Sequence, residues 1–509
     1  MAGSKTKSKS YPQFPSELKQ QLPPKEALEL MPRDLIEEFG AFVFAKDEDG
    51  VKIAARDPND KFLRRFIDER FGERVVWHIA QEEDLAFLLD NLARNFSEEI
   101  GRLADGSAGT NGNIVSLVDR IFRFAFSKAA SDIHIEPTRE VSVVRFRIDG
   151  VLHTLLRLPS DIHNALVSRI KILGNLKIDE YRRPQDGRIE LVEFPDLTLR
   201  ISTVPTLYGE KVAIRVLDDS HKDFSLRSLG FSEAQEAILV RNIEKPFGMI
   251  VTSGPTGSGK TTTLYGLLHM VPKEEVNIST LEDPVEYALA GVNQIQVDPR
   301  AQLTFASGLR SLLRQDPDVM MVGEIRDSET AIMAAEAALT GHLVLTTLHT
   351  NDAPSVFTRL LEMKVEDFTV ASTMNVVVAQ RLVRKLCQAC SKNEKLGSAI
   401  LQKIKERPDI LATLEAMGSG ISSLADKEFK TPVGCDMCLQ SGYRGRVGLF
   451  EVLEMSKTVH DLVLQHASAD RIRDAALQSG FRDILADGID KALAGTTSFA
   501  EVLRATRNS

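Results

Sequence analysis

The chain has 509 residues, a length that exceeds one hydrophobic core and predicts about three or four domains. Hydrophobic residues make up 43% and charged residues 27%, as in soluble globular proteins. The net charge of −9 argues against a nucleic-acid-binding protein, and no apolar run is long enough for a membrane-spanning helix. The first residues lack the apolar core of a secretory signal, and residues 1–24 are predicted to be a disordered tail.

A small N-terminal α/β domain is predicted over residues 25–102. Helical periodicity occurs at residues 35–39 and 60–69. Residues 41–45 and 51–54 lie between them and flank an Asp-Gly pair, which favours two paired strands joined by a tight turn.

A flexible linker is predicted over residues 103–113, where small and polar residues dominate. Residues 114–219 form a second predicted domain, which opens with an amphipathic helix over residues 114–130. Alternating or β-branched segments follow and predict an antiparallel sheet. They lie at residues 131–136, 141–148 and 151–156.

The strongest motif lies in the third predicted domain, residues 220–386. Residues 254–261 match the pattern G-x-x-x-x-G-K-[ST] of a phosphate-binding loop. An apolar strand is predicted before the loop at 248–252, and a helix after it at 262–270, which is the context that the motif requires. The alternative is an accidental glycine-rich turn, which this context disfavours.

The residue types of the loop suit ATP. Glycines let backbone N–H groups approach the phosphates, and the helix N-terminus adds partial positive charge. Lys260 is expected to reach the β- and γ-phosphates, and the Thr261 hydroxyl to bind Mg²⁺. The predicted nucleotide-binding residues are Gly254, Pro255, Thr256, Gly257, Ser258, Gly259, Lys260, Thr261 and Thr262.

Two further strands of this domain end in acidic residues. One begins at residue 278 and ends at Glu282, and the other begins at residue 318 and leads to Glu324. Beside a phosphate loop, such a carboxylate holds Mg²⁺ or polarises the attacking water. Gly323 precedes Glu324 where aspartate is common, which leaves the metal-side role of Glu324 open. Solvated strand ends are the alternative.

Two histidines, His342 and His349, flank an apolar strand at residues 343–348. We predict that both sense the γ-phosphate. The alternative is that they are ordinary core or surface histidines.

All four cysteines fall into two C-x-x-C pairs, Cys387 with Cys390 and Cys435 with Cys438. Four thiolates in two such pairs suit a structural Zn²⁺ site with no open coordination position. Disulfides are a poor explanation in a chain without an export signal, and unrelated free cysteines are the remaining alternative. A zinc subdomain is predicted over residues 387–445.

Together these segments resemble the secretion ATPase superfamily of type II secretion and type IV pili. Its Walker A, Asp, Walker B and His boxes are matched by residues 254–263, 281–287, 313–327 and 340–353. The resemblance extends to SDIHIEP (131–137), RRPQDGRI (182–189), RISTVPTLYGEKVAIR (200–215) and GYRGRVGLFEVL (442–453). The cysteine insert and the long N-terminal region resemble the type II secretion E protein and the pilus assembly ATPase, rather than retraction ATPases.

The resemblance implies an α/β fold with a RecA-like P-loop ATPase core. A PAS-like α+β domain and a small N-terminal α/β domain would precede this core, and a zinc-binding insert and a C-terminal helical region, residues 446–509, would follow it.

The same resemblance implies roles for individual residues. Glu324 would be the glutamate that polarises water, with Glu282 as a second candidate for the general base; the two are not ranked. Arg200 and Arg215 fall where family members supply arginines to a nucleotide site, with Arg188 as a weaker third candidate. A surface ion pair is the alternative for each arginine.

The resemblance also implies an oligomeric state, partner proteins and a cellular location. The chain would be a cytoplasmic homohexamer that hydrolyses ATP to assemble a pilus or a secretion pseudopilus; the choice between these systems stays open. It would act at the inner membrane through a platform protein and a cytoplasmic-side membrane adaptor, with residues 25–102 as its own adaptor domain and no direct contact to nucleic acid. The arginine and glycine repeats with which some relatives bind a cyclic dinucleotide are not found in this region, so no such ligand is predicted.

Two other functions are compatible with a phosphate loop. A ring-shaped nucleic-acid translocating ATPase shares the motif, but the acidic charge and the aromatic content of 6% argue against it. A scaffold that binds nucleotide without hydrolysing it would show no loss of turnover on Glu324→Gln.

Overall fold

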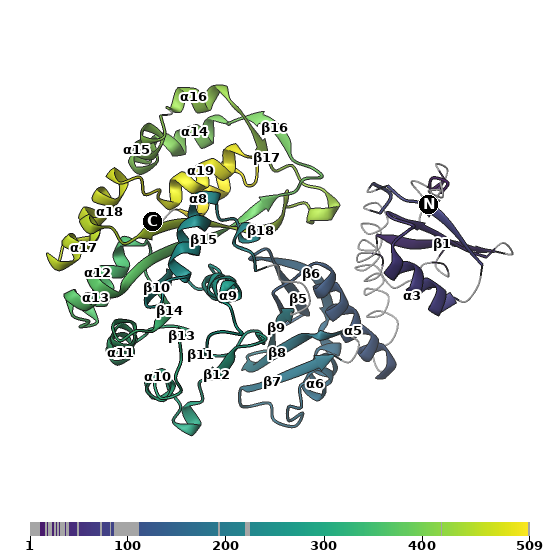
Figure 1. The fold of residues 1–509 in the computed structure, drawn as a ribbon. Helices are drawn as coiled ribbons and strands as arrows, with labels where there is room; N and C mark the ends of the chain where they lie inside the picture. The colour runs from purple at the N-terminus through teal and green to yellow at the C-terminus, as the bar shows by residue number, and fades with distance from the viewer. Residues whose placement is uncertain are drawn as a thin grey trace, which may run out of the picture. The chain divides into compact units, whose positions relative to one another are not determined.

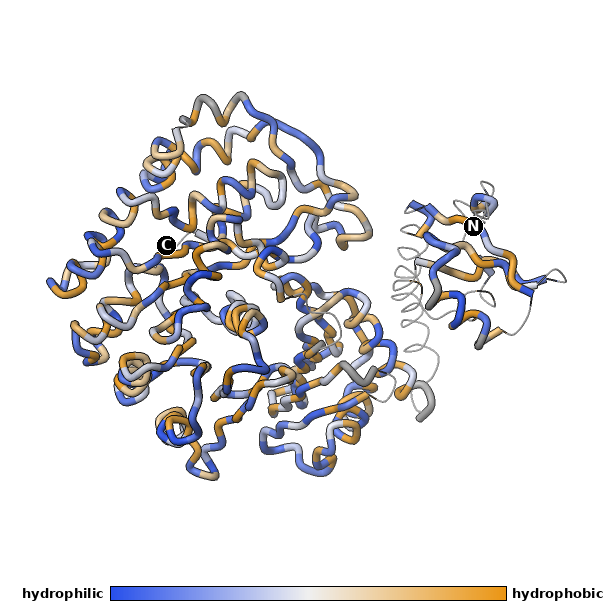
Figure 2. Tube along the Cα trace, viewed as in Figure 1, coloured by the Kyte–Doolittle hydropathy of each residue, from blue (hydrophilic) through white to orange (hydrophobic). Residues whose placement is uncertain are grey.

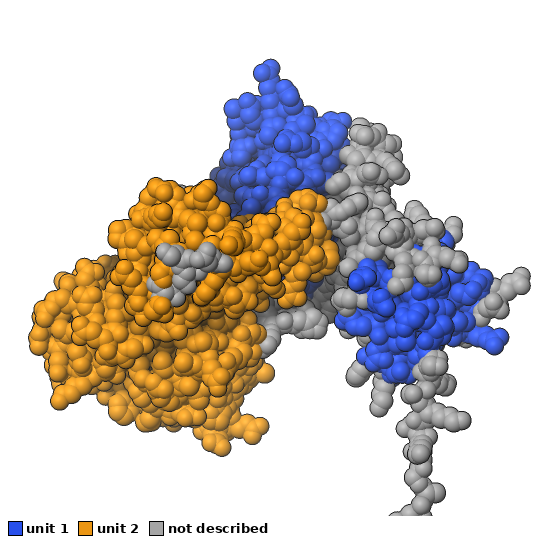
Figure 3. Space-filling model, turned by 90° about the horizontal axis from the view of Figure 1, so that it is seen from above, with its two compact units in different colours: residues 1–218 blue, residues 219–509 orange. Residues whose placement is uncertain are grey.

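The computed structural model divides the chain into two compact units, Met1–Asp218 and Asp219–Ser509, which Figure 3 colours separately. Each unit is described by itself. The structure describes residues 11–15, 18, 23–24, 27, 30, 36, 40–47, 50–71, 74–81, 83–85, 111–191, 194–218, 224–418 and 420–506.

A three-stranded sheet forms the N-terminal part of the first unit. Its elements are β1 (Ala41–Asp47), β2 (Gly50–Ala55), α3 (Lys61–Phe71) and β3 (Val75–Ile79). β1 and β2 are antiparallel, with Asp47 opposite Gly50, so the predicted pairing of the two strands is confirmed, whereas residues 48 and 49 of the predicted turn lie outside the described residues. α3 confirms the second predicted helix, whereas the first, at 35–39, lies outside the described residues apart from Ile36.

β3 was not predicted. It pairs parallel to β2 and brings Trp77 into the core with Phe42 and Ile53.

The second part of the first unit is a six-stranded antiparallel sheet in the order β6-β5-β4-β9-β8-β7. Its elements are α5 (Asn111–Ser127), β4 (Asp132–Pro137), β5 (Val141–Ile148), β6 (Val151–Pro159), α6 (His163–Leu173), β7 (Gln185–Leu191), β8 (Phe194–Thr206) and β9 (Gly209–Asp218) (Figure 1). The predicted antiparallel sheet is confirmed. α5 begins at Asn111, so the last three residues of the predicted linker are helical, and it ends three residues before the predicted end at 130.

One face of this sheet is covered by helices. Ile133 and Ile135 of β4 alternate inward and share a core with Val118 and Phe122 of α5 and Ile170 of α6. Because side chains alternate along a strand, the polar residues between them lie on the opposite face.

The second unit is built on a seven-stranded sheet in the order β12-β11-β13-β14-β10-β15-β18. The strands are β10 (Gly248–Ser253), β11 (Ile278–Glu282), β12 (Asn293–Gln296), β13 (Val319–Val322), β14 (Leu343–Leu348), β15 (Met374–Leu386) and β18 (Tyr443–Glu454). Neighbouring strands are parallel except β18, which runs antiparallel to β15. The predicted strands at 248–252, 278–282 and 343–348 are confirmed, and the strand predicted from residue 318 begins at Val319.

Helices cover both faces of this sheet, and their bounds are α7 (Leu226–Leu229), α8 (Glu233–Ile243), α9 (Lys260–Met270), α10 (Phe305–Leu312), α11 (Ser328–Leu339), α12 (Pro354–Glu362) and α13 (Asp367–Thr373). Val251 and Val377 face a core shared with α11 to α13, while Ile250 and Val376 face one shared with α8 and α9. A strand buried on both faces reads as a continuous apolar run, as these strands do. Orange and blue segments alternate along the covering helices in Figure 2.

An insertion joins β15 to β18 and contains β16 (Lys392–Lys395), α14 (Ser398–Lys405), α15 (Pro408–Ala416), α16 (Ile421–Asp426) and β17 (Glu428–Thr431). The chain then ends in α17 (Lys457–Leu464), α18 (Ala469–Gln478), α19 (Ile484–Leu493) and α20 (Phe499–Ala505). Ile404 and Phe429 of the insertion pack with Ile489 and Phe499 of these helices.

The boundary predicted between residues 445 and 446 cuts through β18. The physical reason is that β18 returns to the sheet after the insertion and pairs with β15, so the ATPase core does not end at residue 386.

Candidate active site

The phosphate loop lies between β10 and α9, at the carboxyl end of a central parallel strand. Gly254, Gly257 and Gly259 have φ of 141°, 77° and 89°, a region that disfavours side chains. A Cβ on Gly254 would lie 2.5 Å from the backbone oxygen of Gln380, so the loop packs directly on β15.

Lys260 is the first residue of α9. Its Nζ donates to the backbone oxygens of Gly254 at 2.8 Å and Pro255 at 3.2 Å. Burial lowers the pKa of Lys260, against the opposing influence of the Glu324 carboxylate. The ammonium therefore lies inside the loop, where the sequence motif requires it.

Glu324 follows β13, and His349 follows β14. These strands are parallel to β10, so both residues lie at the same edge of the sheet as the phosphate loop. Glu324 pairs with Arg326, and its second oxygen lies 3.6 Å from His349 Nε2. The Glu324 side chain is 16% exposed, which leaves it access to a water molecule.

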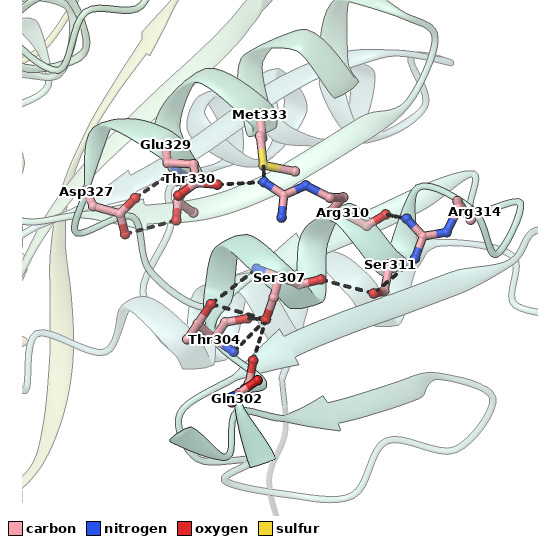
Figure 4. Close-up of polar contacts among 10 residues, drawn as sticks. All are labelled: Gln302, Thr304, Ser307, Arg310, Ser311, Arg314, Asp327, Glu329, Thr330 and Met333. Atoms are coloured by element: carbon pink, nitrogen blue, oxygen red, sulfur yellow. Dashed lines mark hydrogen bonds and ion pairs between the residues drawn. The ribbon is translucent and has the colours of Figure 1, made fainter. Parts of the chain in front are cut away.

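The loop that carries Glu324 is held at both ends. Ile325 N donates to Thr347 O at 3.0 Å, and Thr347 Oγ1 donates to Gly323 O at 2.8 Å. Asp327 caps α11 by accepting from Thr330 N at 2.8 Å (Figure 4).

The helix beside this loop, α10, is also fixed. Its Arg310 donates to Glu329 of α11 at 2.6 Å, and Thr304 and Ser307 form a capping box at its start, as Figure 4 shows. The elements around Glu324 are therefore linked to one another by hydrogen bonds.

Glu282 lies at the end of β11 and is 2% exposed. Its carboxylate accepts from Tyr265 Oη at 2.5 Å, Thr280 Oγ1 at 2.5 Å and Gln294 Nε2 at 3.1 Å. Burial and this contact raise the pKa of Tyr265, so the phenol keeps its proton and remains a donor. With three donors on it, Glu282 fastens α9 to β11, and this geometry favours Glu324 as the residue that activates water.

The structure separates the two histidines. Leu343 pairs with Gly248, the first residue of β10, so His342 lies at the amino edge of the sheet, about 20 Å along the strand from His349. His342 Nδ1 contacts Ala337 O at 2.9 Å. The two ends of a strand lie at opposite edges of a sheet, so only His349 lies at the edge that carries the phosphate loop. Within its own chain, His342 therefore has no support for the predicted contact with the γ-phosphate.

The three candidate arginines form one row across the six-stranded sheet of the first unit. Arg188 of β7 is opposite Arg200 of β8, which is opposite Arg215 of β9. Arg215 Nε lies 3.3 Å from Asp132 Oδ1 on β4. Their strand neighbours Leu199 and Ile201 are buried, so the row lies on the face away from α5 and α6. Their role toward nucleotide stays a prediction.

The four cysteines gather into one cluster, with all four Sγ atoms within 4.8 Å of one another. The distances are 3.9 Å for Cys387–Cys435, 3.9 Å for Cys390–Cys438 and 3.7 Å for Cys435–Cys438. A tetrahedral Zn²⁺ with Zn–S bonds of about 2.3 Å needs sulfurs about 3.8 Å apart, so the cluster fits this metal.

The backbone also suits metal binding. Cys435 N and Gly442 N donate to Cys438 Sγ at 3.2 Å and 3.1 Å. Although burial opposes ionisation, these donors lower the pKa of Cys438 to about 7. Burial raises the pKa of Cys387 to about 12, so its ionisation would depend on a bound cation.

Several residues around the site were not predicted. They are Gln380 and Arg381 of β15 and Tyr265 of α9. Gln380 donates to Ser258 O in the phosphate loop, Arg381 donates to Asn351 O, and Tyr265 donates to Glu282. Gln380 and Arg381 could have been predicted from the sequence, because they are two adjacent polar residues inside the apolar strand VVVAQRLV. A buried polar side chain in such a strand needs a partner.

Comparison with known proteins agrees with this geometry. The sequence matches the family described as "Type II/IV secretion system protein" over residues 107–504 and the "MshEN domain" over residues 13–99. The type IV pilus assembly ATPase TfpB of Acinetobacter baylyi is 45% identical over 87% of this chain and 73% of its own length. The type II secretion system protein E of Aeromonas hydrophila is 43% identical over 86% of each chain.

A solved structure shares the fold. The ATPase DotB of Legionella pneumophila aligns with a TM-score of 0.55 and 21% identity, over 77% of this chain and 96% of that chain. The chain therefore belongs to the Type II/IV secretion system protein family, and it is an ATPase. The resemblance, the fold class and the enzyme class predicted from the sequence are confirmed. None of the described helices is long and apolar enough to cross a bilayer.

Proposed function

We propose that this ATPase is the motor that assembles a type IV pilus or a type II secretion pseudopilus, working as a homohexamer on the cytoplasmic face of the inner membrane. The observation that carries the proposal is sequence identity: the chain is 45% identical to a pilus assembly ATPase and 43% identical to a secretion E protein, in alignments that cover most of each pair of chains. The platform protein and the membrane adaptor are its expected partners.

The geometry of the second unit supports the following proposal for the hydrolysis step. Backbone N–H groups of the loop and Lys260 hold the phosphates, and the α9 N-terminus favours their negative charge. Thr261 would hold Mg²⁺, which would neutralise part of the phosphate charge. Glu324 takes up the proton of the attacking water, and His349 orients its carboxylate.

In a ring of chains, the arginine row of one chain suits the role of completing the nucleotide site of the next chain. A guanidinium is planar, permanently charged and able to hydrogen-bond a phosphoryl oxygen at two points. In our proposal, Arg200 and Arg215 reach the nucleotide of a neighbouring chain, so that binding and release of nucleotide move the two units relative to each other.

The test is ATPase activity per chain measured against protein concentration with Mg²⁺. Activity per chain should rise with concentration, and Arg200→Ala should abolish the rise. Arg145→Ala is the matched control, because Arg145 lies on the same sheet but pairs with Glu136 at 2.7 Å instead of joining the row. If activity per chain does not change with concentration and Arg200→Ala has no effect on it, the proposal that two chains share one site is overturned.

The cellular role is tested separately. In the source organism, Glu324→Gln should remove either surface filaments or extracellular release of secreted proteins, which identifies the system. If both survive the substitution, the motor assignment fails even though the enzyme hydrolyses ATP.

A further inference from the structure

Gln380 lies where the seven-stranded sheet meets the phosphate loop. Ala379 is paired with Ser253, the last residue of β10, and Gln380 is the next residue of β15. Val376 and Val378 belong to the core beneath α9, so alternation along the strand directs Gln380 toward α9 as well. Its side chain is 1% exposed.

Both ends of the Gln380 amide are used. Nε2 donates to Ser258 O at 2.8 Å, and Oε1 accepts from Thr263 Oγ1 at 2.9 Å. A backbone oxygen can only accept, so the amide nitrogen must face Ser258, and the hydroxyl of Thr263 must donate to the amide oxygen. The orientation of the amide is therefore fixed.

The two contacts bracket the residues that bind phosphate and metal. Ser258 lies in the loop and Thr263 in the first turn of α9, and the four residues between them are Gly259, Lys260, Thr261 and Thr262. Ser258 and Thr263 are 3% and 1% exposed, so water cannot replace the amide. One side chain thus sets the angle between the loop and the helix that follows it.

The next residue of β15 fastens the other side of the site. Arg381 points to the opposite face, is 8% exposed and donates to Asn351 O at 2.8 Å. Asn351 lies two residues after His349, the neighbour of Glu324. β15 therefore contacts the phosphate loop through Gln380 and the segment after β14 through Arg381.

We propose that Gln380, together with Thr263, is a positioning residue for nucleotide: it holds the phosphate loop and the first turn of α9 in the geometry that binds the phosphates. This inference rests on the nucleotide role proposed for the loop. Gln380 does not touch the reacting atoms; it acts through Ser258 and Thr263.

The test compares full-length variants by ADP titration and by steady-state kinetics with Mg²⁺. Gln380→Leu keeps most of the side-chain volume and removes both hydrogen bonds, so ADP affinity should fall about tenfold and the KM for ATP should rise similarly. Thr263→Val removes one bond and should cost about threefold, whereas Thr263→Ser keeps the hydroxyl and should bind as the wild type does.

Gln235 provides the matched control. It is a buried glutamine of α8 that also makes two hydrogen bonds, from Ser232 N at 2.9 Å and to Phe450 O at 3.1 Å, away from the loop. Gln235→Leu should lower the thermal midpoint without changing ADP affinity. If Gln380→Leu changes ADP affinity no more than Gln235→Leu does, the proposal is overturned.

Two further variants separate the possible failures. If Gln380→Leu does not fold, Thr263→Val against Thr263→Ser decides the question alone, and equal ADP affinity of these two overturns the proposal. If Lys260→Ala binds ADP normally, the loop is not the nucleotide site and the proposed function fails first. If Lys260→Ala abolishes binding while Gln380→Leu and Thr263→Val bind normally, only the role of Gln380 is refuted.

Discussion

Glu282 and Glu324 show how neighbours decide what a carboxylate at a strand end does. Glu282 ends β11 and Glu324 comes shortly after β13 of the same sheet, and both are acidic, so the sequence cannot rank them. In the structure Glu282 is surrounded by donors, whereas Glu324 shares its oxygens with Arg326 and His349 at a more exposed position. A base that must accept a proton from water needs a free direction of approach.

We expect Glu324→Gln to lower kcat by about 100-fold with little change in KM for ATP, because the amide keeps the size and loses the basicity. Glu282→Gln should lower thermal stability and leave kcat within about tenfold, because its amide nitrogen would face a hydroxyl donor. Steady-state kinetics and thermal melts of both variants check this. A larger loss of kcat in Glu282→Gln than in Glu324→Gln would reverse the assignment.

Glu451 of β18 is a second buried carboxylate, 1% exposed. It accepts from Ala353 N at the start of α12 and from Ile484 N, at 3.2 Å, at the start of α19. Burial raises the pKa of Glu451 to about 7, with Asp352 and Asp483 nearby adding to the shift and Arg473 opposing it.

The sign of the pH dependence follows from this raised pKa. Between about pH 4.5 and about pH 7 the folded state holds a proton on Glu451 that the unfolded state has lost, so stability falls as pH rises through this window. The loss is on the order of 3 kcal/mol. Thermal midpoints should fall between these pH values in the wild type and less steeply in Glu451→Gln. Equal slopes in the two proteins would contradict the prediction.

At the scale of elements, β15 and β18 organise the C-terminal half. β15 passes the phosphate loop at Gln380, near its middle, and Cys387 follows directly after its last residue. Cys387 N donates to Gly442 O at 3.0 Å, so the cysteine cluster stands where the two strands meet. Losing the metal should therefore loosen both the insertion and the adjoining strand ends.

We expect one Zn²⁺ per chain by elemental analysis. Chelation or Cys387→Ser should increase amide exchange and proteolysis within residues 387–442, while Zn²⁺ returned to the chelated protein should restore protection. Protection that is equal with and without metal would show that the four thiols need no ion to stay together.

The types of the elements were largely predictable from the sequence, whereas pairings between strands far apart in the chain were not. The strands at the phosphate loop were found because strands buried on both faces are continuous apolar runs, as in Val319–Val322 and Leu343–Leu348. The role of β18 was missed because its partner β15 lies before the insertion, and no local pattern reports a pairing over that distance. His342 was misplaced for a related reason, because a flanking position does not say which sheet edge it occupies.

At the scale of the whole molecule, the two units carry different halves of the proposed chemistry. Lys260 and Glu324 belong to the second unit, whereas the row formed by Arg188, Arg200 and Arg215 belongs to the first. Such a division suits a site completed by a neighbouring chain, and it predicts complementation between differently disabled chains.

Mixing provides the measurement. Glu324→Gln chains retain the arginine row, and Arg200→Ala chains retain the glutamate, so mixed rings should recover ATPase activity that neither variant has alone. Arg200→Ala mixed with a second preparation of itself is the control. No recovery in the mixture, with ring formation verified by size, would mean that both residues serve the same chain's site.

The insertion also bears on how the chain reaches this fold. Leu386 and Tyr443 are strand partners, yet 56 residues separate them. Until that stretch has been synthesised, one edge of β15 has no strand to pair with, a state that invites association with other chains. Bringing such distant ends together costs entropy that grows with loop length. A metal ion held by the two C-x-x-C pairs would close this loop before the two strands pair. The pairing of β15 with β18 would then begin from strand ends that are already close together. The supply of metal during synthesis would therefore set the yield of folded protein.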